Sequence, residues 1–187
     1  MPLLYCTASS DHDLRQILSL QQANHASTLT HSQAERDGFV TVMHSFELLK
    51  QMNLAAPQII AKDGDRVIGY ALVMLKSFGN MIPVLQPMFD RLATIQYGEN
   101  NKITDYSFYV MGQICIDEQY RGQGVFDSLY NKHKELLQTA YDICVTSVST
   151  RNKRSMKAHE RVGFTTVLTF QDATDEWNIL TWNLRVK

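Results

Sequence analysis

The stretch QYRGQGVFDSL (residues 119–129) places Gly122 and Gly124 between an apolar run typical of a strand and a run with helical spacing. The first N–H groups of a helix have no partner within it and carry a partial positive charge, so a turn of this kind suits a phosphate group. Glycines at a strand-to-helix turn also serve as plain turn residues. The stretch alone therefore leaves a phosphate site and a simple turn open.

Neither common nucleotide-binding fingerprint occurs in this stretch. A Rossmann turn needs a third glycine, where this chain has Phe126 and Asp127, and a P-loop needs Gly-Lys followed by Ser or Thr. These differences disfavour a nucleotide phosphohydrolase. What remains is a short turn that begins at Arg121 and offers consecutive N–H groups. Such a turn predicts a pyrophosphate bound at a helix start without a metal ion.

The residues around this turn predict an α/β (α+β) fold. Apolar and alternating runs predict strands at 3–7, 59–62, 67–75, 107–117, 142–150, 164–171 and 176–186. Helical spacing and capping residues predict helices within 9–25, 30–38, 44–53, 88–95, 125–141 and 152–162. Because some strands alternate with helices and others meet as hairpins, we expect a mixed, mostly antiparallel central sheet of about seven strands with helices on both faces.

The bulk composition predicts one cytoplasmic domain spanning residues 1–187. Apolar residues make up 44% and charged residues 20% of the chain, an ordinary globular balance. The net charge of −1 points to no nucleic acid and no anionic membrane as partner. We expect Cys6, Cys115 and Cys144 to be reduced thiols. No spacing of cysteines and histidines suits a metal, and no apolar run reaches the length of a membrane span.

A second motif, NKRSMKAHERVGF, follows at residues 152–164. Asn152, Ser155 and His159 stand three and four residues apart, so a helix would place them on one face. Gly163 then stands where a helix C-cap is expected, followed by Phe164. The two motifs together carry more information than either one alone.

With both motifs in order, the sequence resembles the GNAT superfamily of acetyl-CoA-dependent N-acetyltransferases. The phosphate loop of that family, Gln/Arg-x-x-Gly-x-Gly/Ala, is matched by Gln119, Gly122 and Gly124. Its later signature, Asn-x-x-Ala/Ser-x-x-x-Tyr-x-x-x-Gly-Phe, is matched at every position but one, where His159 replaces the usual tyrosine. The resemblance is specific across residues 107–170 and only topological before them.

The resemblance implies a binding site for acetyl-CoA, used as co-substrate without a metal. The pantetheine arm would lie beside the strand that precedes the loop, and one N–H there would hold the thioester oxygen. Asn152 would bond to the arm and His159 would lie near the sulfur, while Ser155, on the same helix face, is implied among the residues that bind the cofactor. The residues implied as backbone partners of the arm are Ile114, Cys115 and Ile116, and those implied around the pyrophosphate are Arg121, Gly122, Gln123, Gly124, Val125 and Phe126.

The implied chemistry is the direct attack of a neutral primary amine on a thioester carbonyl. Three effects would lower the barrier: the protein holds both reactants together, an N–H points at the oxyanion, and an acid protonates the sulfur. His159 is the predicted acid, and a surface histidine on a polar helix is the other interpretation. The strand 107–116 contains no Asp or Glu. The base therefore stays open among Glu47, His44 and Asp117, or is dispensable if the amine arrives neutral.

Two further groups of residues have a functional and a structural interpretation. Cys115 could act as a nucleophile, but an apolar strand without a nearby histidine favours a buried structural thiol. The basic residues Arg151, Lys153, Arg154 and Lys157 could contact nucleic acid. Because aromatic residues are not interleaved among them, they are better described as a solvated face with one or two side chains reaching the phosphates of the coenzyme.

The acceptor amine is not encoded in any motif. It can be a small molecule or a peptide. The segments expected to shape its site are 24–56 and 77–105. In the second segment, Met81, Met88 and Phe89 form a lid, part of the core or a wall of the acceptor pocket. The near-neutral overall charge disfavours strongly polycationic acceptors. A longer acyl group, a non-catalytic acyl-CoA-binding or regulatory module, and a homodimer paired through the C-terminal strands all stay open.

Overall fold

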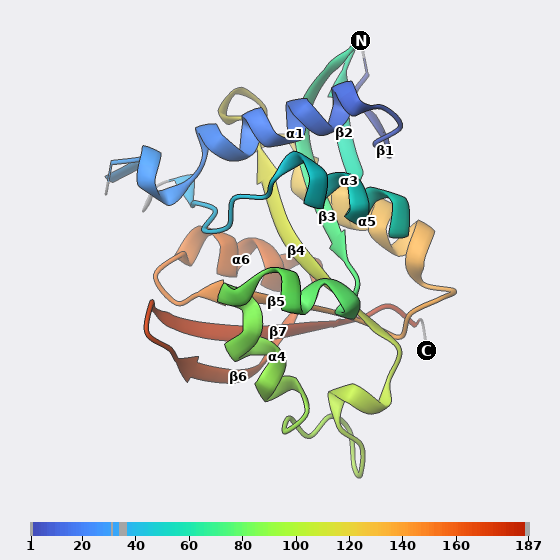
Figure 1. Cartoon of the computed structure of the whole chain (residues 1–187), viewed down its shortest axis with the longest axis vertical. Coiled ribbons are helices and arrows are strands. Elements are labelled where there is room, and N and C mark those ends of the chain that lie inside the picture. Colours follow the sequence, from blue (N-terminus) through green and yellow to red (C-terminus); the bar gives the residue numbers. More distant parts are fainter. Residues whose placement is uncertain (1, 31, 34–36, 186–187) are drawn as a thin grey trace.

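In the computed structural model, which describes residues 2–30, 32–33 and 37–185, the strands form one mixed sheet in the order β1-β2-β3-β4-β5-β7-β6 (Figure 1). Every neighbouring pair is antiparallel except β4 and β5. This confirms the expected mixed, mostly antiparallel sheet. The strands are β1 (Leu4–Thr7), β2 (Ile59–Asp63), β3 (Arg66–Met74), β4 (Phe108–Ile116), β5 (Ile143–Ser149), β6 (Thr165–Gln171) and β7 (Glu176–Asn183).

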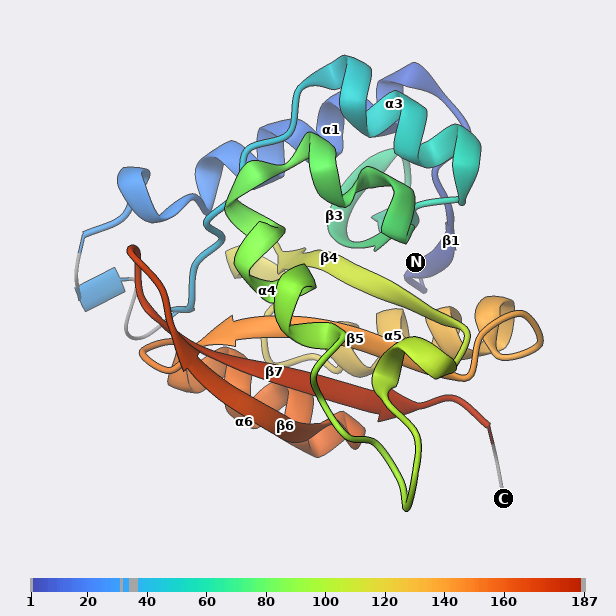
Figure 2. The same ribbon diagram turned by 60° about the horizontal axis from the view of Figure 1, so that its bottom comes forward.

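Helices cover both faces of the sheet, as expected. Figure 2 shows α1 and α3 on one side and α5 and α6 on the other. The helix expected at 30–38 falls largely on residues outside the described ranges. The α-helices are α1 (Asp11–Ala23), α3 (Phe46–Ala55), α4 (Gln86–Leu92), α5 (Val125–Leu137) and α6 (Lys153–Val162); the 3₁₀ turns are η1 (Ala26–Thr28), η2 (Lys76–Met81), η3 (Pro83–Leu85), η4 (Ile103–Asp105) and η5 (Glu118–Tyr120).

Alternation along the central strands divides the core between the two faces. On β3, Tyr70 and Leu72 pack in the cluster beneath α1 and α3, whereas Ala71 and Val73 pack in the cluster beneath α5. Successive side chains of a strand point to opposite faces, so an apolar run with no polar alternation becomes buried on both. Each fully buried aliphatic side chain stabilises the fold by roughly 1.5–3 kcal/mol. The sheet is therefore held firmly at its centre, where the site lies.

Several helix boundaries differ from the sequence expectation, and two of the differences have a clear local cause. The helix expected to reach Tyr141 ends at Leu137, because the N–H groups of Ala140 and Tyr141 both donate to the Leu137 carbonyl and close a tight turn. The helix expected after Pro87 instead begins at Gln86, with Pro87 in its first turn. Proline is tolerated there because an N–H in the first turn has no partner within the helix.

The parallel strands β4 and β5 separate after a short pairing. Their ladder joins only Phe108–Val110 to Ile143–Val145, although β4 continues to Ile116 and β5 to Ser149. Where the ladder ends, the Thr146 hydroxyl donates to the Met111 carbonyl at 3.0 Å. In Figure 1, β4 runs obliquely to β5 and β7. The separation opens a gap in the middle of the sheet, at the end that leads into α5.

Candidate functional site

The backbone of β4 turns hydrogen-bonding groups toward this gap. The Asp117 N–H donates to the Ile68 carbonyl at 2.8 Å, and Tyr70 lies opposite Cys115. Because the hydrogen bonds of an antiparallel pair alternate, the main chain of Cys115 faces β3, whereas that of Ile114 and Ile116 faces the gap. Of these three predicted backbone partners, the structure turns two toward the gap and one away from it.

The turn before α5 presents bare main chain. Gly122 and Gly124 have φ angles of +76° and +78°, and a Cβ built on either would meet no atom within 4 Å. Gly124 caps α5 without a side-chain hydrogen bond, and the first intrahelical bond runs from the Ser128 N–H to the Gly124 carbonyl. The N–H groups just before Ser128 therefore lie in the open helix start, the arrangement that binds anions.

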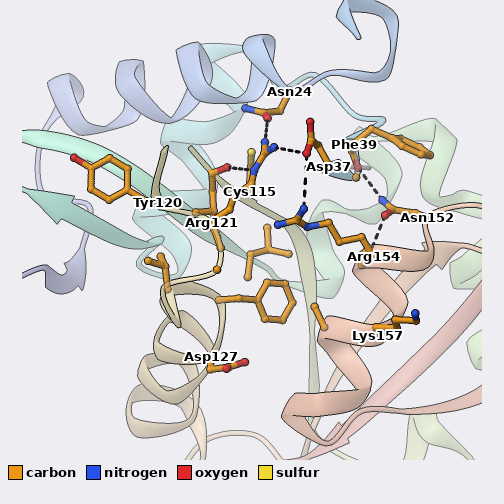
Figure 3. A pocket seen from close by; sticks show the side chains of 18 of the residues that line it. Asn24, Asp37, Phe39, Cys115, Tyr120, Arg121, Asp127, Asn152, Arg154 and Lys157 are labelled. Atoms are coloured by element: carbon orange, nitrogen blue, oxygen red, sulfur yellow. Dashed lines mark hydrogen bonds and ion pairs between the residues drawn. The ribbon is translucent and has the colours of Figure 1, made fainter. Parts of the chain in front are cut away.

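A cavity of about 490 Å³ lies against this turn and the end of β4 (Figure 3). Of the residues expected to bind the cofactor, all but Gln123 and His159 line it. The Gln123 side chain donates to the Gln119 carbonyl at 2.9 Å. The predicted residues that line the cavity are Ile114, Cys115, Ile116, Arg121, Gly122, Gly124, Val125, Phe126, Asn152 and Ser155.

Charged side chains from three parts of the chain meet at one end of this cavity. Arg121 donates to the Ile116 carbonyl at 3.1 Å and to Asn24 of the loop after α1 at 2.5 Å. Its guanidinium also pairs with Asp37 at 3.5 Å, and Arg154 of α6 pairs with the same carboxylate at 3.7 Å (Figure 3). Arg121 is thus held by side chains remote in sequence, and its cationic group faces the cavity.

The expected division of the basic cluster is seen in part. Arg154 and Lys157 line the cavity, in agreement with the expectation that one or two members would be near a phosphate site. Arg151 instead forms an ion pair with Asp175 at 2.7 Å, and Lys153 does not line the cavity. A positive group in a partly apolar cavity favours an anionic ligand.

Asn152 joins the start of α6 to the loop after α1. Its Oδ1 accepts the Ser155 N–H at 3.1 Å and so caps α6, while its Nδ2 donates to the Phe39 carbonyl at 3.2 Å. The side chain of Asn152 is 7% exposed. It therefore fixes the position of Phe39, whose segment lines the cavity.

His159 is buried, in contrast to the interpretation as a surface histidine. It is 1% exposed and packs edge-on against the rings of Phe126, Tyr130 and Phe164. Its Nδ1 lies 2.8 Å from the Ser155 carbonyl, which can only accept, so this nitrogen carries the proton. Nε2 has no hydrogen-bond partner among the described residues. Burial lowers the pKa of His159 to about 4, so the ring is neutral at pH 7.

A second, smaller cavity of about 90 Å³ continues from the first along the gap. His159 lines this second cavity, as do Met88 and the segments 39–42 and 84–85. These are parts of the two segments expected to shape the acceptor site, whereas Met81 is half exposed and Phe89 packs against the core. Five residues line both cavities: Phe39, Val40, Ile114, Asn152 and Ser155.

None of the three candidate bases lines either cavity. Glu47 is exposed in the first turn of α3, and Asp117 pairs with Arg66 at 2.5 Å. His44 is buried, and burial lowers its pKa to about 4. Its Nδ1 lies 2.8 Å from Gln21 Nε2, within a buried amide network. None of the residues predicted as the base therefore lies in the wall that Ile114 shares with the two cavities.

Cys115 has the properties of a structural thiol. It is 8% exposed, and burial raises its pKa to about 12, so the nucleophilic thiolate is scarce at neutral pH. The three cysteines are free thiols, as expected. Within the described ranges, no group of three or more His, Cys, Asp or Glu side chains could hold a metal ion.

Several residues of the site were missed by the sequence analysis. The contacts of Asn24 and Asp37 with Arg121, and of Phe39 with Asn152, join residues that are 84 to 113 positions apart, and no local pattern signals such contacts. Asp172 and Trp177, from the hairpin of β6 and β7, line the second cavity. The Asp172-Ala-Thr-Asp turn has capping residues, but nothing in the sequence indicates what it faces.

Comparisons with known proteins agree with this geometry. The sequence pattern of the acetyltransferase (GNAT) family matches residues 25–164. A search of curated proteins found no significant match. Among the helices of the described ranges, none has the length and apolar character that a membrane crossing requires.

Solved structures share the fold over nearly the whole chain at low identity. A chain of the NatC complex bound to Gag peptide and CoA has a TM-score of 0.66 at 13% identity, covering 99% of this chain and 100% of that one. Ard1 from Thermoplasma volcanium has a TM-score of 0.66 at 11% sequence identity, and the match covers 98% of each chain. An N-acetyltransferase from Staphylococcus aureus has a TM-score of 0.64 at 15% sequence identity, and the match covers 99% of this chain and 100% of that one. At such identities these likenesses concern the fold alone.

Proposed function

Because the chain belongs to the acetyltransferase (GNAT) family, we propose that it transfers an acetyl group from acetyl-CoA to a primary amine by direct attack in a ternary complex. The observation that carries this proposal is the meeting of two cavities in the gap between β4 and β5. The larger cavity ends at a glycine-rich helix start, and the smaller is mostly apolar. Ile114 lines both, so reactants bound in the two cavities would meet beside it.

The first cavity fits acetyl-CoA. Open space above Gly122 and Gly124 leaves room for a diphosphate against the N–H groups of the turn and of α5. Arg121, Arg154 and Lys157 supply positive charge around it. The free edge of β4 offers main-chain partners to the amide groups of the pantetheine arm, in the manner of an added strand.

In this proposal, most of the catalysis comes from holding the two reactants in contact and from a main-chain N–H that stabilises the oxyanion. Two reactants held in contact gain up to about 7–11 kcal/mol over a bimolecular encounter. The Ile114 N–H faces the gap and is the proposed donor to the oxyanion, a contact worth about 3 kcal/mol in comparable sites. Neither contribution requires a charged side chain beside the thioester.

His159 is proposed to handle the proton. Its ring is neutral, and Nε2 is the nitrogen free to accept a proton. When the amine adds to the carbonyl, the ammonium of the tetrahedral adduct gives a proton to Nε2. When the carbon–sulfur bond breaks, Nε2–H returns that proton to the leaving thiolate. Such a shuttle keeps the predicted acid role of His159 and makes a carboxylate base unnecessary, since the imidazole is protonated only between the two steps.

The test of this proposal is release of free coenzyme A from acetyl-CoA against a panel of small amines and peptides. We expect turnover above hydrolysis with part of the panel. His159→Phe keeps the aromatic packing and should lower kcat about 100-fold or more, as expected for loss of a proton-transfer group, with the Kd of acetyl-CoA within about two-fold. The matched control is His12→Phe, an exposed position on α1.

The alternative is an acyl-CoA-binding module without turnover. It would be supported if acetyl-CoA binds the wild-type protein but no amine of the panel releases coenzyme A above the hydrolysis rate. A full kcat in His159→Phe would leave the acyl transfer intact but would contradict the role of His159.

A further inference from the structure

The wall of the second cavity carries one ionised side chain among the described residues that line it. Most of this wall is apolar, from residues such as Val42, Met88 and Phe170. Its polar members are otherwise amides, hydroxyls and the neutral His159. The exception is Asp172, at the end of β6.

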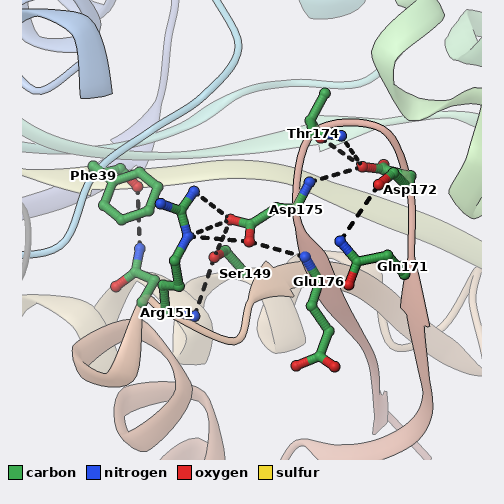
Figure 4. A network of polar contacts seen from close by, with 9 residues as sticks. Phe39, Ser149, Arg151, Gln171, Asp172, Thr174, Asp175 and Glu176 are labelled. Atoms are coloured by element: carbon green, nitrogen blue, oxygen red, sulfur yellow. Dashed lines mark hydrogen bonds and ion pairs between the residues drawn. The ribbon is translucent and has the colours of Figure 1, made fainter.

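The turn between β6 and β7 holds the Asp172 carboxylate in its ionised form (Figure 4). Oδ1 accepts three hydrogen bonds, from the Thr174 N–H at 2.7 Å, the Thr174 hydroxyl at 2.6 Å and the Asp175 N–H at 3.0 Å. Burial raises the pKa of Asp172, but these hydrogen bonds outweigh it and lower the pKa to about 2. The carboxylate is therefore negatively charged at any physiological pH.

The charge of Asp172 is not neutralised by a cation of the protein. The neighbouring Asp175 is engaged by Arg151 at 2.7 Å and by the Ser149 hydroxyl at 2.6 Å (Figure 4). Asp172 forms no ion pair within the described part of the chain, and its hydrogen bonds to Thr174 and Asp175 all use Oδ1, which leaves Oδ2 with the indole of Trp177 as its neighbour. The hairpin thus presents a rigid, charged oxygen on the side of an otherwise uncharged cavity.

The geometry points to Asp172 as the residue that selects the acceptor. This inference rests on the proposed acetyl transfer and names its substrate class: an amine on a short apolar body with a second cationic group at its other end. The reactive amine lies near Ile114, the apolar body contacts the wall, and the distal cation pairs with Asp172. A carboxylate at that distal end of the acceptor is repelled, so ω-amino acids are poor acceptors.

The experiment compares three acceptors that differ only at the end remote from the reactive amine. Cadaverine carries a distal ammonium, pentylamine carries none and aminovalerate carries a carboxylate. In the wild-type protein we expect kcat/KM to fall about ten-fold from cadaverine to pentylamine and further to aminovalerate, a ratio typical of one desolvated charge pair. Because the preference is electrostatic, raising the salt concentration to about 0.5 M should reduce it.

Asp172→Asn keeps an oxygen that can accept the Thr174 and Asp175 hydrogen bonds but removes the charge. We expect cadaverine and pentylamine to be used with kcat/KM values within about two-fold of each other in this variant. Glu176→Gln is the matched control, since Glu176 is exposed on the same hairpin and lines neither cavity. It should keep the wild-type preference.

Each outcome bears on the inference. Equal use of cadaverine and pentylamine by the wild-type protein, a preference for aminovalerate, or an unchanged preference in Asp172→Asn would overturn it while leaving acetyl transfer standing. If none of the amines in the wider panel is acetylated although acetyl-CoA binds, the proposed function itself fails and this inference falls with it.

Discussion

Gly124 stands where the chain turns into α5, with a φ angle of +78° that side-chain-bearing residues rarely adopt. A Cβ there would point into open space beside the first cavity. The same backbone geometry that makes the turn possible therefore leaves room for a ligand. At the scale of single residues, this turn is the feature on which the phosphate site depends.

We expect Gly124→Glu to abolish binding of acetyl-CoA, because a carboxylate would lie where the diphosphate is proposed. Calorimetric titration measures this as at least a 100-fold rise in Kd. Gly64→Glu is the control: Gly64 also has a positive φ, of +56°, and open space around it, but lies in the β2–β3 turn away from both cavities. Equal affinities of the two variants would refute the assignment of the loop.

The sequence of the two motifs indicated which residues would lie together, but not how deeply each would be buried. The spacing of Asn152, Ser155 and His159 predicted a shared helix face, and the structure places all three around the cavities. Nothing in the polar run NKRSMKAHERV indicated that His159 would be buried, because the rings that cover it come from α5 and from Phe164. Burial, and therefore protonation state, is a tertiary property.

At the scale of elements, the start of α6 is coupled to the loop that forms both cavities. Asn152 caps α6 through Oδ1 and holds the Phe39 carbonyl through Nδ2. We expect Asn152→Asp to keep the cap but to lose the N–H to Phe39, so the free energy of unfolding should fall by about 1 kcal/mol. Loss of the same N–H should raise the KM of the acceptor about five-fold, since a buried hydrogen bond contributes about 1 kcal/mol.

A capping variant remote from the site separates stability from function. Ser10 caps α1 by accepting the Asp13 N–H at 3.1 Å. Ser10→Ala should lower the free energy of unfolding by about 1 kcal/mol with no change in the KM of the acceptor. If Asn152→Asp likewise leaves that KM unchanged, the coupling through Phe39 is wrong.

Helices and strands whose apolar residues follow a clear pattern could be predicted, whereas the places where they end or separate could not. The apolar run 107–117 correctly indicated a central strand, since only a strand buried on both faces lacks polar alternation. The point at which β4 leaves β5 has no counterpart in hydrophobicity, because the residues of both strands stay buried or half-buried beyond it. The end of α5 was misplaced because its last turn is set by hydrogen bonds to Leu137 rather than by composition.

At the scale of the whole molecule, both faces of the sheet bury neutral histidines. His44 lies on the face of α1, and His133 and His159 lie on the other; burial lowers the pKa of each to about 4. An unfolded histidine has a pKa of about 6.5, so the unfolded chain binds more protons between pH 6.5 and pH 4. The free energy of unfolding should therefore be highest above pH 6.5 and fall as the pH drops toward 4.

Urea unfolding at pH 7, 6 and 5 measures this dependence. Near pH 5, the slope of the free energy of unfolding against pH should correspond to about two to three protons that these histidines take up on unfolding. His133→Gln should reduce that slope by about one proton, whereas His12→Gln, at an exposed position, should not. A free energy of unfolding that stays constant from pH 7 to pH 5 is incompatible with three buried neutral histidines.

The acceptor could not be predicted because the site proposed for it is assembled from distant parts of the chain. The near-neutral total charge of the sequence disfavoured polycationic acceptors, but a total says nothing about where each charge lies. In the fold, Asp175 is paired with Arg151, whereas Asp172 of the same turn faces the second cavity without an ion pair in the described ranges. The proposed preference for a dicationic amine therefore rests on local charge rather than on net charge.

The central claim is that a diphosphate binds the main chain at the start of α5. The most direct test is a crystal structure of the protein soaked with coenzyme A. We predict diphosphate oxygens within about 2.7–3.2 Å of main-chain nitrogens in residues 122–126, with the pantetheine arm along the free edge of β4. Well-defined coenzyme A bound elsewhere, with this turn empty, would contradict the account.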